Sequence, residues 1–141
     1  MKVSIKDIIK YPLRVIPVDG GNVMHGIKNS DNGFIKFGEA YFSYIQKNRV
    51  KAWKKHSLMQ LNLMVPKGQV LFVFLDTYGL FREEILGENN NDRLTVPPGF
   101  WFGFKGIHSE ESIILNISNI IHDDNEVKKK KIEEIKYNWM L

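Results

Sequence analysis

A cluster of basic residues with one histidine is the part of this sequence best suited to proton transfer or anion binding. The segment reads Lys-Ala-Trp-Lys-Lys-His over residues 51–56. If it is extended, side chains alternate between faces, so Lys54 and His56 lie together while Lys51 and Trp53 point to the opposite side. Crowded cations lower the pKa of a lysine, because each positive charge disfavours the next. The pair could therefore remove a proton from a carbon beside a carbonyl group, or bind a phosphate. The competing interpretation is a solvated sheet edge that carries a hydrogen-bonded histidine.

Polar and aromatic residues further along the chain are candidates for lining a site. Asn62 interrupts an apolar run. A buried amide must be hydrogen-bonded, so Asn62 would either face a pocket or satisfy a neighbouring backbone group. Trp101 and Phe102 follow a Pro-Pro-Gly bend at residues 97–99, where the prolines force an extended backbone. An aromatic ring at such a bend could stack on a base or a sugar, although core packing is its commoner use.

The histidines do not form a metal-binding pattern. His25, His108 and His122 are scattered, and no His-x-His pair lies near an acidic residue. A metal-dependent site would require these histidines or His56 to converge with a carboxylate. The sequence therefore predicts no metal and no other cofactor. The absence of cysteine also excludes disulfides, thiol catalysis and thiolate metal sites, and it is consistent with a reducing cytoplasm.

Short strands must position these residues, because turn signals separate apolar runs roughly every ten residues. The runs cover residues 37–45, 51–56, 61–65, 69–75, 81–86, 101–105 and 112–117. Residues 61–75 are expected to form a hairpin, and the spacing of apolar residues over 125–137 predicts a short helix. A chain of 141 residues with 43% hydrophobic content can bury one good core. We therefore expect a single all-β domain, a barrel or jelly roll, with its core at about 37–122 and a helical tail at 123–141.

Charge and hydropathy restrict the partners. Charges break every apolar run near the N-terminus, so neither a signal peptide nor a membrane span is predicted. The net charge of +4 comes largely from lysines at 51–55 and 128–131, and the second group is interpreted as a solvated helix face. Aromatic residues lie within apolar runs and do not alternate with these lysines, which argues against nucleic-acid binding. A cytoplasmic protein without a membrane or nucleic-acid partner is expected.

Several segments together resemble the cupin-type nucleotide-sugar enzymes related to dTDP-4-dehydrorhamnose 3,5-epimerase, in particular a short branch associated with surface polysaccharides. They are residues 51–56, Leu-Asn-Leu at 61–63 with Val-Pro-Lys-Gly at 65–68, Val-Pro-Pro-Gly-Phe-Trp-Phe-Gly-Phe at 96–104, and Leu-Asn-Ile at 115–117 followed by His122-Asp123. The resemblance spans about residues 37 to 127, and the Pro-Pro-Gly strand is its most specific part.

This resemblance implies a jelly-roll cupin, usually a dimer, that needs no metal and inverts carbons beside the keto group of a nucleotide-linked 4-keto-6-deoxy sugar. In such enzymes a histidine removes the proton and a tyrosine returns one from the opposite face. Here Lys54 stands at the position of the catalytic histidine, and His56 matches the second histidine of the related 3,4-ketoisomerases. Asn116 stands where the tyrosine is expected, and Phe102 replaces a further family histidine.

The resulting hypothesis is an epimerase or isomerase that serves cell-surface polysaccharide or lipopolysaccharide synthesis. Lys54 and His56 would transfer protons, with Tyr41, Tyr44 or His122 as the acid. The other expected site residues would contact the substrate. Lys51 would contact a phosphate and Trp101 a ring. The pocket walls would be formed by Trp53, Asn62, Phe102, Asn116 and His122. The partners would be a nucleotide sugar and a second copy of the chain. The alternative is a non-catalytic cupin that binds a nucleotide sugar or a glycan.

Overall fold

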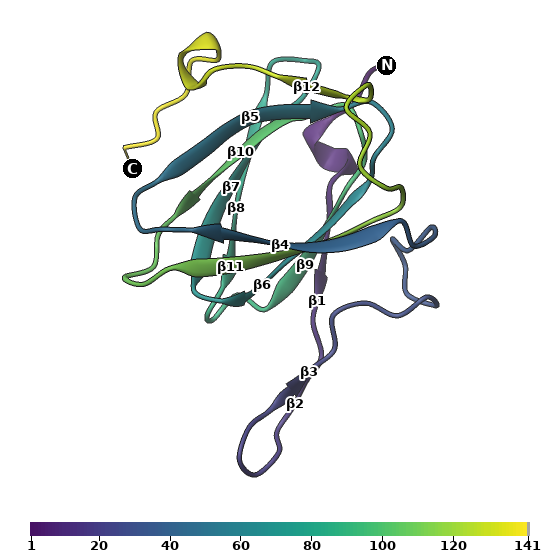
Figure 1. The fold of residues 1–141 in the computed structure, drawn as a ribbon, viewed down its shortest axis with the longest axis vertical. Helices are drawn as coiled ribbons and strands as arrows, with labels where there is room; N and C mark the ends of the chain where they lie inside the picture. The colour runs from purple at the N-terminus through teal and green to yellow at the C-terminus, as the bar shows by residue number, and fades with distance from the viewer. Residues whose placement is uncertain (141) are drawn as a thin grey trace.

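Ten strands of the chain form two five-stranded antiparallel sheets in the computed structural model, which describes residues 1–140 (Figure 1). The first sheet has the order β1(Ile9–Pro12), β9(Asp92–Val96), β6(Leu61–Lys67), β11(Ser112–Ser118), β4(Glu39–Ile45). The second has the order β12(Val127–Lys129), β5(Val50–His56), β10(Trp101–Gly106), β7(Gln69–Leu75), β8(Phe81–Gly87). The prediction of a nearly all-β fold is therefore confirmed.

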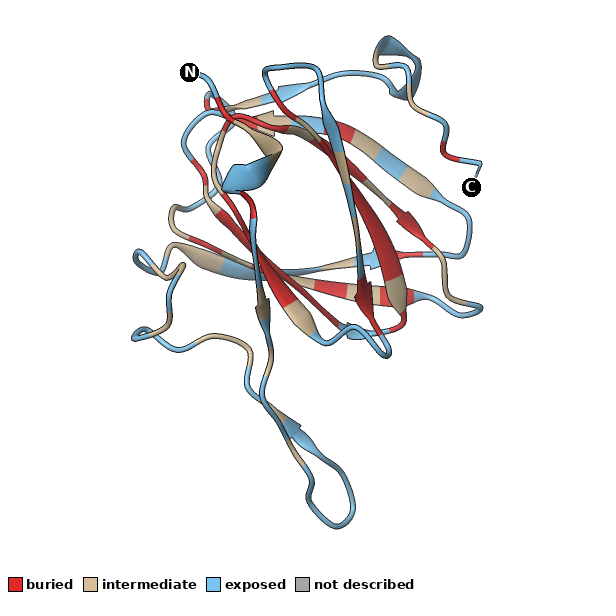
Figure 2. Cartoon of the chain, turned by 180° about the vertical axis from the view of Figure 1, so that it is seen from behind, coloured by how far each residue is buried: buried red, intermediate tan, exposed pale blue. Residues whose placement is uncertain are grey.

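The core lies between the two sheets, because alternate side chains of each strand point inward. From β7, Val70, Phe72 and Phe74 are fully buried, and they share one apolar cluster with Leu61 and Leu63 of β6. Figure 2 shows buried residues concentrated along the facing strands. These five residues come from the apolar runs at 61–65 and 69–75, which explains why the two strands were predictable.

The connection between β6 and β7 differs from the predicted hairpin. The two strands belong to different sheets, so the chain turns a corner at Gly68 and crosses from one layer to the other. Gly68 has φ +88, and a Cβ there would lie 2.1 Å from the Ser112 hydroxyl. Only glycine fits this corner. A turn signal between two strands predicts a change of direction, but it does not specify whether the strands pair.

The C-terminal segment is also not the predicted helix. It forms strand β12, which pairs with β5, and then a short 3-10 turn, η2(Ile132–Glu134). Beyond η2, Ile135, Tyr137 and Trp139 pack on the outer face of the second sheet. These residues recur with a period of two, as in an extended chain. Packing on that sheet therefore outweighs the weak helical spacing of the preceding lysines and glutamates.

A two-stranded hairpin, β2(Val15–Ile16) with β3(Val23–Met24), projects from the body of the molecule (Figure 1). It turns at Gly20 and Gly21, which both have positive φ. At the other end of β1, the 3-10 turn η1(Ile5–Asp7) follows a capping box formed by Ser4. Within residues 1–140 no helix has the length and apolarity needed to cross a bilayer.

Candidate functional site

A cavity of about 470 Å³ opens between the two sheets, on the side where β4 ends one sheet and β5 and β12 end the other. Its apolar wall comes from the inward-facing residues of the core strands. The polar lining comes from β4, β5, β11 and the segment that contains β12. The polar and charged residues are Tyr41, Ser43, Lys51, Lys54, Asn116, Lys129 and Lys130. An apolar pocket with a few convergent polar groups is the usual form of a small-molecule site.

Lysines from two segments that are distant in the sequence but paired in the fold, β5 and β12, line one side of this cavity. Lys51 and Lys54 both line it, although strict alternation would place them on opposite faces. The register between β5 and β10 shifts by one residue at Trp53: Lys54 pairs with Phe102, but Ala52 pairs with Gly103. This β-bulge reverses the alternation and turns Lys51 toward the cavity. Burial lowers the pKa of Lys54, and the nearby charges of Lys129 and Lys51 lower it further.

A buried ion-pairing contact joins His56 to Glu126, a residue that the sequence analysis missed. The His56 Nδ1 and Glu126 Oε1 atoms lie 2.5 Å apart, and both residues are buried. Burial alone would raise the pKa of Glu126, but the hydrogen bond from His56 and the N–H groups of Leu58 and Met59 together lower it. The ionised carboxylate can only accept, so Nδ1 carries the proton of this hydrogen bond, and Nε2 is the acceptor nitrogen of the neutral tautomer.

The carboxylate of Glu126 is held rigidly in this position. Its other oxygen, Oε2, accepts hydrogen bonds from the backbone N–H groups of Ser57, Leu58 and Met59, at 3.1, 3.1 and 3.2 Å. These bonds fix both the loop after β5 and the carboxylate against the imidazole. The orientation of His56 is therefore set before any ligand binds.

A second hollow of about 320 Å³ adjoins the cavity and shares Tyr41 and Lys54 with it. His56 and His122 line this hollow, which places the predicted proton-transfer residues Lys54 and His56 around one space. The Tyr41 hydroxyl accepts a 3.1 Å hydrogen bond from the Asn116 side chain. Burial raises the pKa of Tyr41, so the phenol keeps its proton at neutral pH.

The predicted acids differ in their positions. Tyr41 borders both hollows, whereas Tyr44 is half exposed and borders neither of them. His122 borders only the smaller hollow, and its ring is paired with Asp124 at 2.7 Å in an exposed contact. Among these candidates, Tyr41 has the position and the protonation state of a proton donor.

Two predicted pocket walls, Phe102 and Asn116, do line the cavity. Phe102 stacks on His56 with ring centroids 6.0 Å apart and an interplanar angle of 25°. Asn116 is buried, and besides Tyr41 it contacts the backbone N–H of Asn62 through Oδ1 at 3.1 Å. The amide at position 116 therefore positions a tyrosine on the neighbouring strand β4.

Of the two tryptophans predicted to contact the substrate, Trp53 borders the cavity and Trp101 does not. Trp53 borders the cavity, but its ring packs with Trp139 and Tyr137 of the tail, and its Nε1 donates to the Ile132 carbonyl at 3.2 Å. Trp101 does not line the cavity. It belongs to the apolar cluster on the outer face of the second sheet, with the Lys130 ammonium 4.8 Å from its ring centroid. The β-bulge sets the orientation of Trp53, and the C-terminal tail packs against both tryptophans on the outer face of the sheet.

Asn62 also points away from the cavity. Its side-chain oxygen accepts hydrogen bonds from Arg93 at 2.7 Å and from Thr95 at 2.6 Å, and its nitrogen donates to the Gly33 carbonyl at 3.2 Å. The inward positions of β6 are taken by Leu61 and Leu63, so the residue between them must face the opposite side of the sheet. Asn62 is therefore a structural residue of the outer face.

Lys129 and Lys130 line the cavity. The interpretation of lysines 128–131 as a solvated helix face is therefore wrong for these two residues. No local signal marked them or Glu126 as site residues, because β12 meets β5 only in the folded chain. Among the described residues, no group of three or more histidine, aspartate and glutamate side chains is arranged to hold a metal ion.

Comparisons with known proteins identify similar folds and sequences, although no protein-family model matches the chain. A crystal structure of a dTDP sugar isomerase from Desulfovibrio desulfuricans has 31% sequence identity and a TM-score of 0.90, covering 95% of this chain and 91% of that one. The dTDP-4-dehydrorhamnose 3,5-epimerase of Sulfolobus tokodaii has 23% identity and a TM-score of 0.80, covering 92% and 80%.

A curated sequence is similar as well. The probable low-salt glycan biosynthesis epimerase Agl13 of Haloferax volcanii is 28% identical over 100 residues. The match covers 66% of this chain and 64% of that protein, so slightly less than two thirds of the curated relative is represented.

Proposed function

We infer that this chain, which belongs to the family of nucleotide-sugar epimerases and isomerases related to dTDP-4-dehydrorhamnose 3,5-epimerase, is itself an epimerase or isomerase of a nucleotide-linked 4-keto sugar. The observation that carries the proposal is one cavity of about 470 Å³ with four lysines in its lining, beside an imidazole oriented by a buried carboxylate. Cations suit the diphosphate of such a substrate, and the imidazole suits proton abstraction.

The proposed reaction begins with removal of a proton from the carbon next to the keto group. His56 is suited to this step because Glu126 holds Nδ1–H and leaves Nε2 as the acceptor. Lys54 shares the same hollow and has a lowered pKa, so its neutral amine is an additional base. The electron pair of the C–H bond moves onto the carbonyl oxygen as an enolate, which the lysine charges stabilise.

Return of a proton completes the reaction. Tyr41 is the proposed donor, because its protonated phenol borders both hollows and Asn116 fixes its hydroxyl. Protonation of the same carbon from the opposite face inverts it, and the enolate collapses back to the ketone. This assignment places the acid on β4, on the opposite sheet from His56 on β5.

The nucleotide part of the substrate would lie toward the cationic mouth. Lys51, Lys129 and Lys130 line the cavity beside Lys54, and the Lys51 ammonium donates one hydrogen bond to the Tyr44 carbonyl at 2.8 Å. The remaining N–H groups of Lys51 are free to contact a diphosphate. A dTDP-linked sugar is the first substrate to test, since the similar isomerase is a dTDP sugar isomerase.

The chain passes repeatedly from one sheet to the other, which supports a jelly-roll cupin formed by one domain over residues 1–141. We propose a homodimer, because β4 leaves a sheet edge with exposed Phe42 and Tyr44 that a second copy could cover. We further propose a cytoplasmic role in synthesis of a cell-surface polysaccharide, such as lipopolysaccharide.

Deuterium wash-in tests the proposed activity directly. The wild-type protein in heavy water should introduce deuterium at C3 or C5 of one member of a panel of dTDP-, GDP- and UDP-4-keto sugars, as detected by NMR. His56→Ala should abolish the exchange, and Lys54→Ala should reduce it at least about tenfold, because proton-transfer groups typically contribute 10²–10⁴-fold. Tyr41→Phe should retain exchange while losing net inversion. If every sugar fails to exchange but one still binds, the chain is a binding module and the proposal is wrong.

The pH dependence of activity should reflect the pKa of Lys54 and the effect of the neighbouring lysines on it. A base must be neutral to accept a proton, so activity should rise as pH increases through the pKa of Lys54, which lies below its usual range. Lys129→Gln removes a neighbouring cation and should move this rise to higher pH, because the pKa of Lys54 returns toward its ordinary value. Lys129→Arg keeps the charge and is the matched control. Identical pH profiles for the glutamine variant and the wild type would show that Lys54 is not the titrating base.

A further inference from the structure

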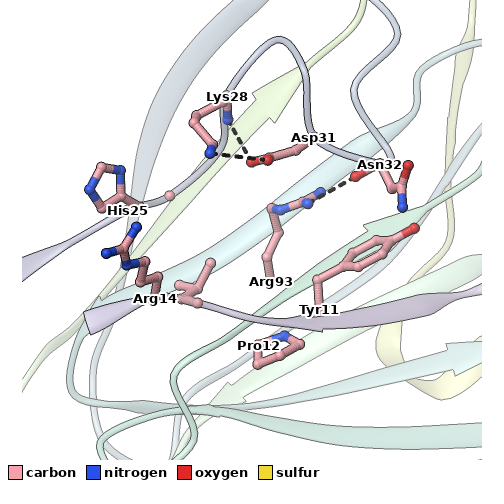
Figure 3. Close-up of a pocket in the computed structure, with 10 residues that line it drawn as sticks. Tyr11, Pro12, Arg14, His25, Lys28, Asp31, Asn32 and Arg93 are labelled. Carbon is pink, nitrogen blue, oxygen red and sulfur yellow. Dashed lines mark hydrogen bonds and ion pairs between the residues drawn. The ribbon is translucent and has the colours of Figure 1, made fainter. Parts of the chain in front are cut away.

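A separate pocket of about 290 Å³ lies on the outer face of the first sheet, beneath the chain segment that follows the projecting hairpin (Figure 3). It shares no lining residue with the two hollows described above. Its walls come from β1, β9 and residues 25–32. The charged and aromatic residues in these walls are Tyr11, Arg14, His25, Lys28, Asp31 and Arg93.

The lining of this pocket has more positive than negative groups. Arg14, Lys28 and Arg93 contribute three permanent cations, and Asp31 contributes the only carboxylate. Asp31 is already engaged by Lys28, whose ammonium lies 4.0 Å from Oδ1 and whose backbone N–H donates to Oδ2 at 2.8 Å. Arg14 is exposed, and within residues 1–140 its guanidinium has no hydrogen bond or ion pair. A net positive charge therefore remains in the pocket.

Arg93 forms the buried base of the pocket and has only neutral oxygens as partners. It is 3% exposed, its Nη1 donates to Asn62 and Thr95, and its Nη2 donates to the Asn32 carbonyl at 2.9 Å. Its Nε has no partner, and its guanidinium lies 4.6 Å from the ring centroid of Tyr11. Burial lowers the pKa of Arg93, and the nearby charge of Asp31, which makes no hydrogen bond to the guanidinium, offsets this only in part.

We propose that this pocket is a binding site for a compact oxyanion of the phosphate class, held by Arg93 at its base and by Arg14 and Lys28 at its rim. A dianion would compensate the surplus charge of the lining, whereas a single carboxylate would compensate only part of it. The two arginines also provide planar N–H groups that match the oxygen spacing of a phosphate. The volume of about 290 Å³ suits phosphate or a small phosphomonoester.

Titration of the full chain with inorganic phosphate tests this site without any turnover. Amide resonances of Gly26, Lys28 and Asn32 should shift and saturate in two-dimensional NMR spectra. The double variant R14A/K28A should bind phosphate at least about tenfold more weakly, because two charge-assisted contacts are lost. Both residues are exposed, so the double variant should keep the thermal stability of the wild type. Lys36→Ala, an exposed lysine outside the pocket, is the matched control.

Two results would overturn the proposal. One is the absence of saturating shifts at these amides, and the other is equal phosphate affinity in R14A/K28A and Lys36→Ala. Shifts confined to Lys51, Lys54 and Lys129 would also count against it, because phosphate would then occupy the cavity between the sheets. The variant K51A/K54A should leave the shifts at Gly26 and Asn32 unchanged. The outcome is therefore independent of whether the enzymatic proposal holds.

A second titration distinguishes the sources of the oxyanion. Glucose 1-phosphate, a phosphomonoester, is compared with inorganic phosphate under the same conditions. Tighter binding of the ester, lost again in R14A/K28A, assigns the site to a phosphorylated metabolite. Equal or weaker binding of the ester assigns it to free phosphate.

Discussion

Replacement of Glu126 by glutamine should lower kcat by about two to four orders of magnitude. The glutamine side chain can still fill the space, but it carries no charge to hold the proton on His56 Nδ1. The imidazole then loses both its orientation and the negative charge that stabilises its protonated form during catalysis. Steady-state turnover of the sugar identified by deuterium exchange measures the effect. A fall in kcat with little change in KM is expected, because Glu126 lies behind His56 and borders neither hollow.

The same substitution should weaken the fold by about 1–3 kcal/mol, since three backbone N–H groups lose a charged acceptor. The pKa of Glu126 is lowered in the folded state, so its stabilising contribution is present above the pKa of an unfolded glutamate and is lost as pH falls. Urea unfolding in mildly acidic buffers should therefore show a shallower pH dependence for Glu126→Gln than for the wild type.

Asp124→Asn provides the control for both effects. Asp124 pairs with His122 on the surface, where its side chain is 91% exposed, so this contact should contribute little. Near wild-type activity and stability are expected. If the two variants have equally small effects on kcat, His56 does not act through Glu126.

Replacement of Trp53 by alanine should lower the free energy of unfolding by about 3–5 kcal/mol, as is typical of a buried aromatic residue. Trp53 is 1% exposed, and its ring lies 5.3 Å from that of Trp139 and 6.2 Å from that of Tyr137. The loss would release the tail as well as open a void. Equilibrium denaturation in urea, followed by circular dichroism, measures the change.

Two further variants separate packing from ligand contact. Trp53→Phe keeps an aromatic ring, and it should fold with a smaller loss and leave substrate affinity unchanged. Trp101→Ala removes a partly exposed ring from the same outer face and should cost less than Trp53→Ala. A raised KM in Trp53→Phe with unchanged stability would instead make Trp53 a pocket wall.

The strands were predictable because their signals are local. Apolar runs such as residues 69–75 fix a buried strand by composition alone, and alternation places Lys54 and His56 on one face of β5. The structure agrees with both predictions. Turn residues were also recognisable, but the corner at Gly68 required knowledge of which strands pair. Pairing depends on contacts between distant segments, which no short window of sequence contains.

The site residues that the sequence did not predict depend on contacts between segments that are far apart in the chain. Glu126 meets His56 across 70 residues, and Lys129 and Lys130 reach the cavity only because the tail adds a strand beside β5. The bulge at Trp53 depends on the register with β10, so the orientation of Lys51 could not follow from alternation. The period of two in Ile135, Tyr137 and Trp139 was the one available signal for an extended tail.

The tail has a consequence for biosynthesis of the protein. Glu126 emerges from the ribosome 70 residues after His56, and Trp139 emerges later still. Until then the nascent chain can pair its central strands, but Trp53, Leu71 and Val73 face solvent without their cover. An uncovered apolar sheet face is prone to association between chains. Newly made chains are therefore most vulnerable to aggregation just before the last strand docks, and substitutions in the tail should reduce the yield of folded protein more than they reduce the stability of molecules that have folded.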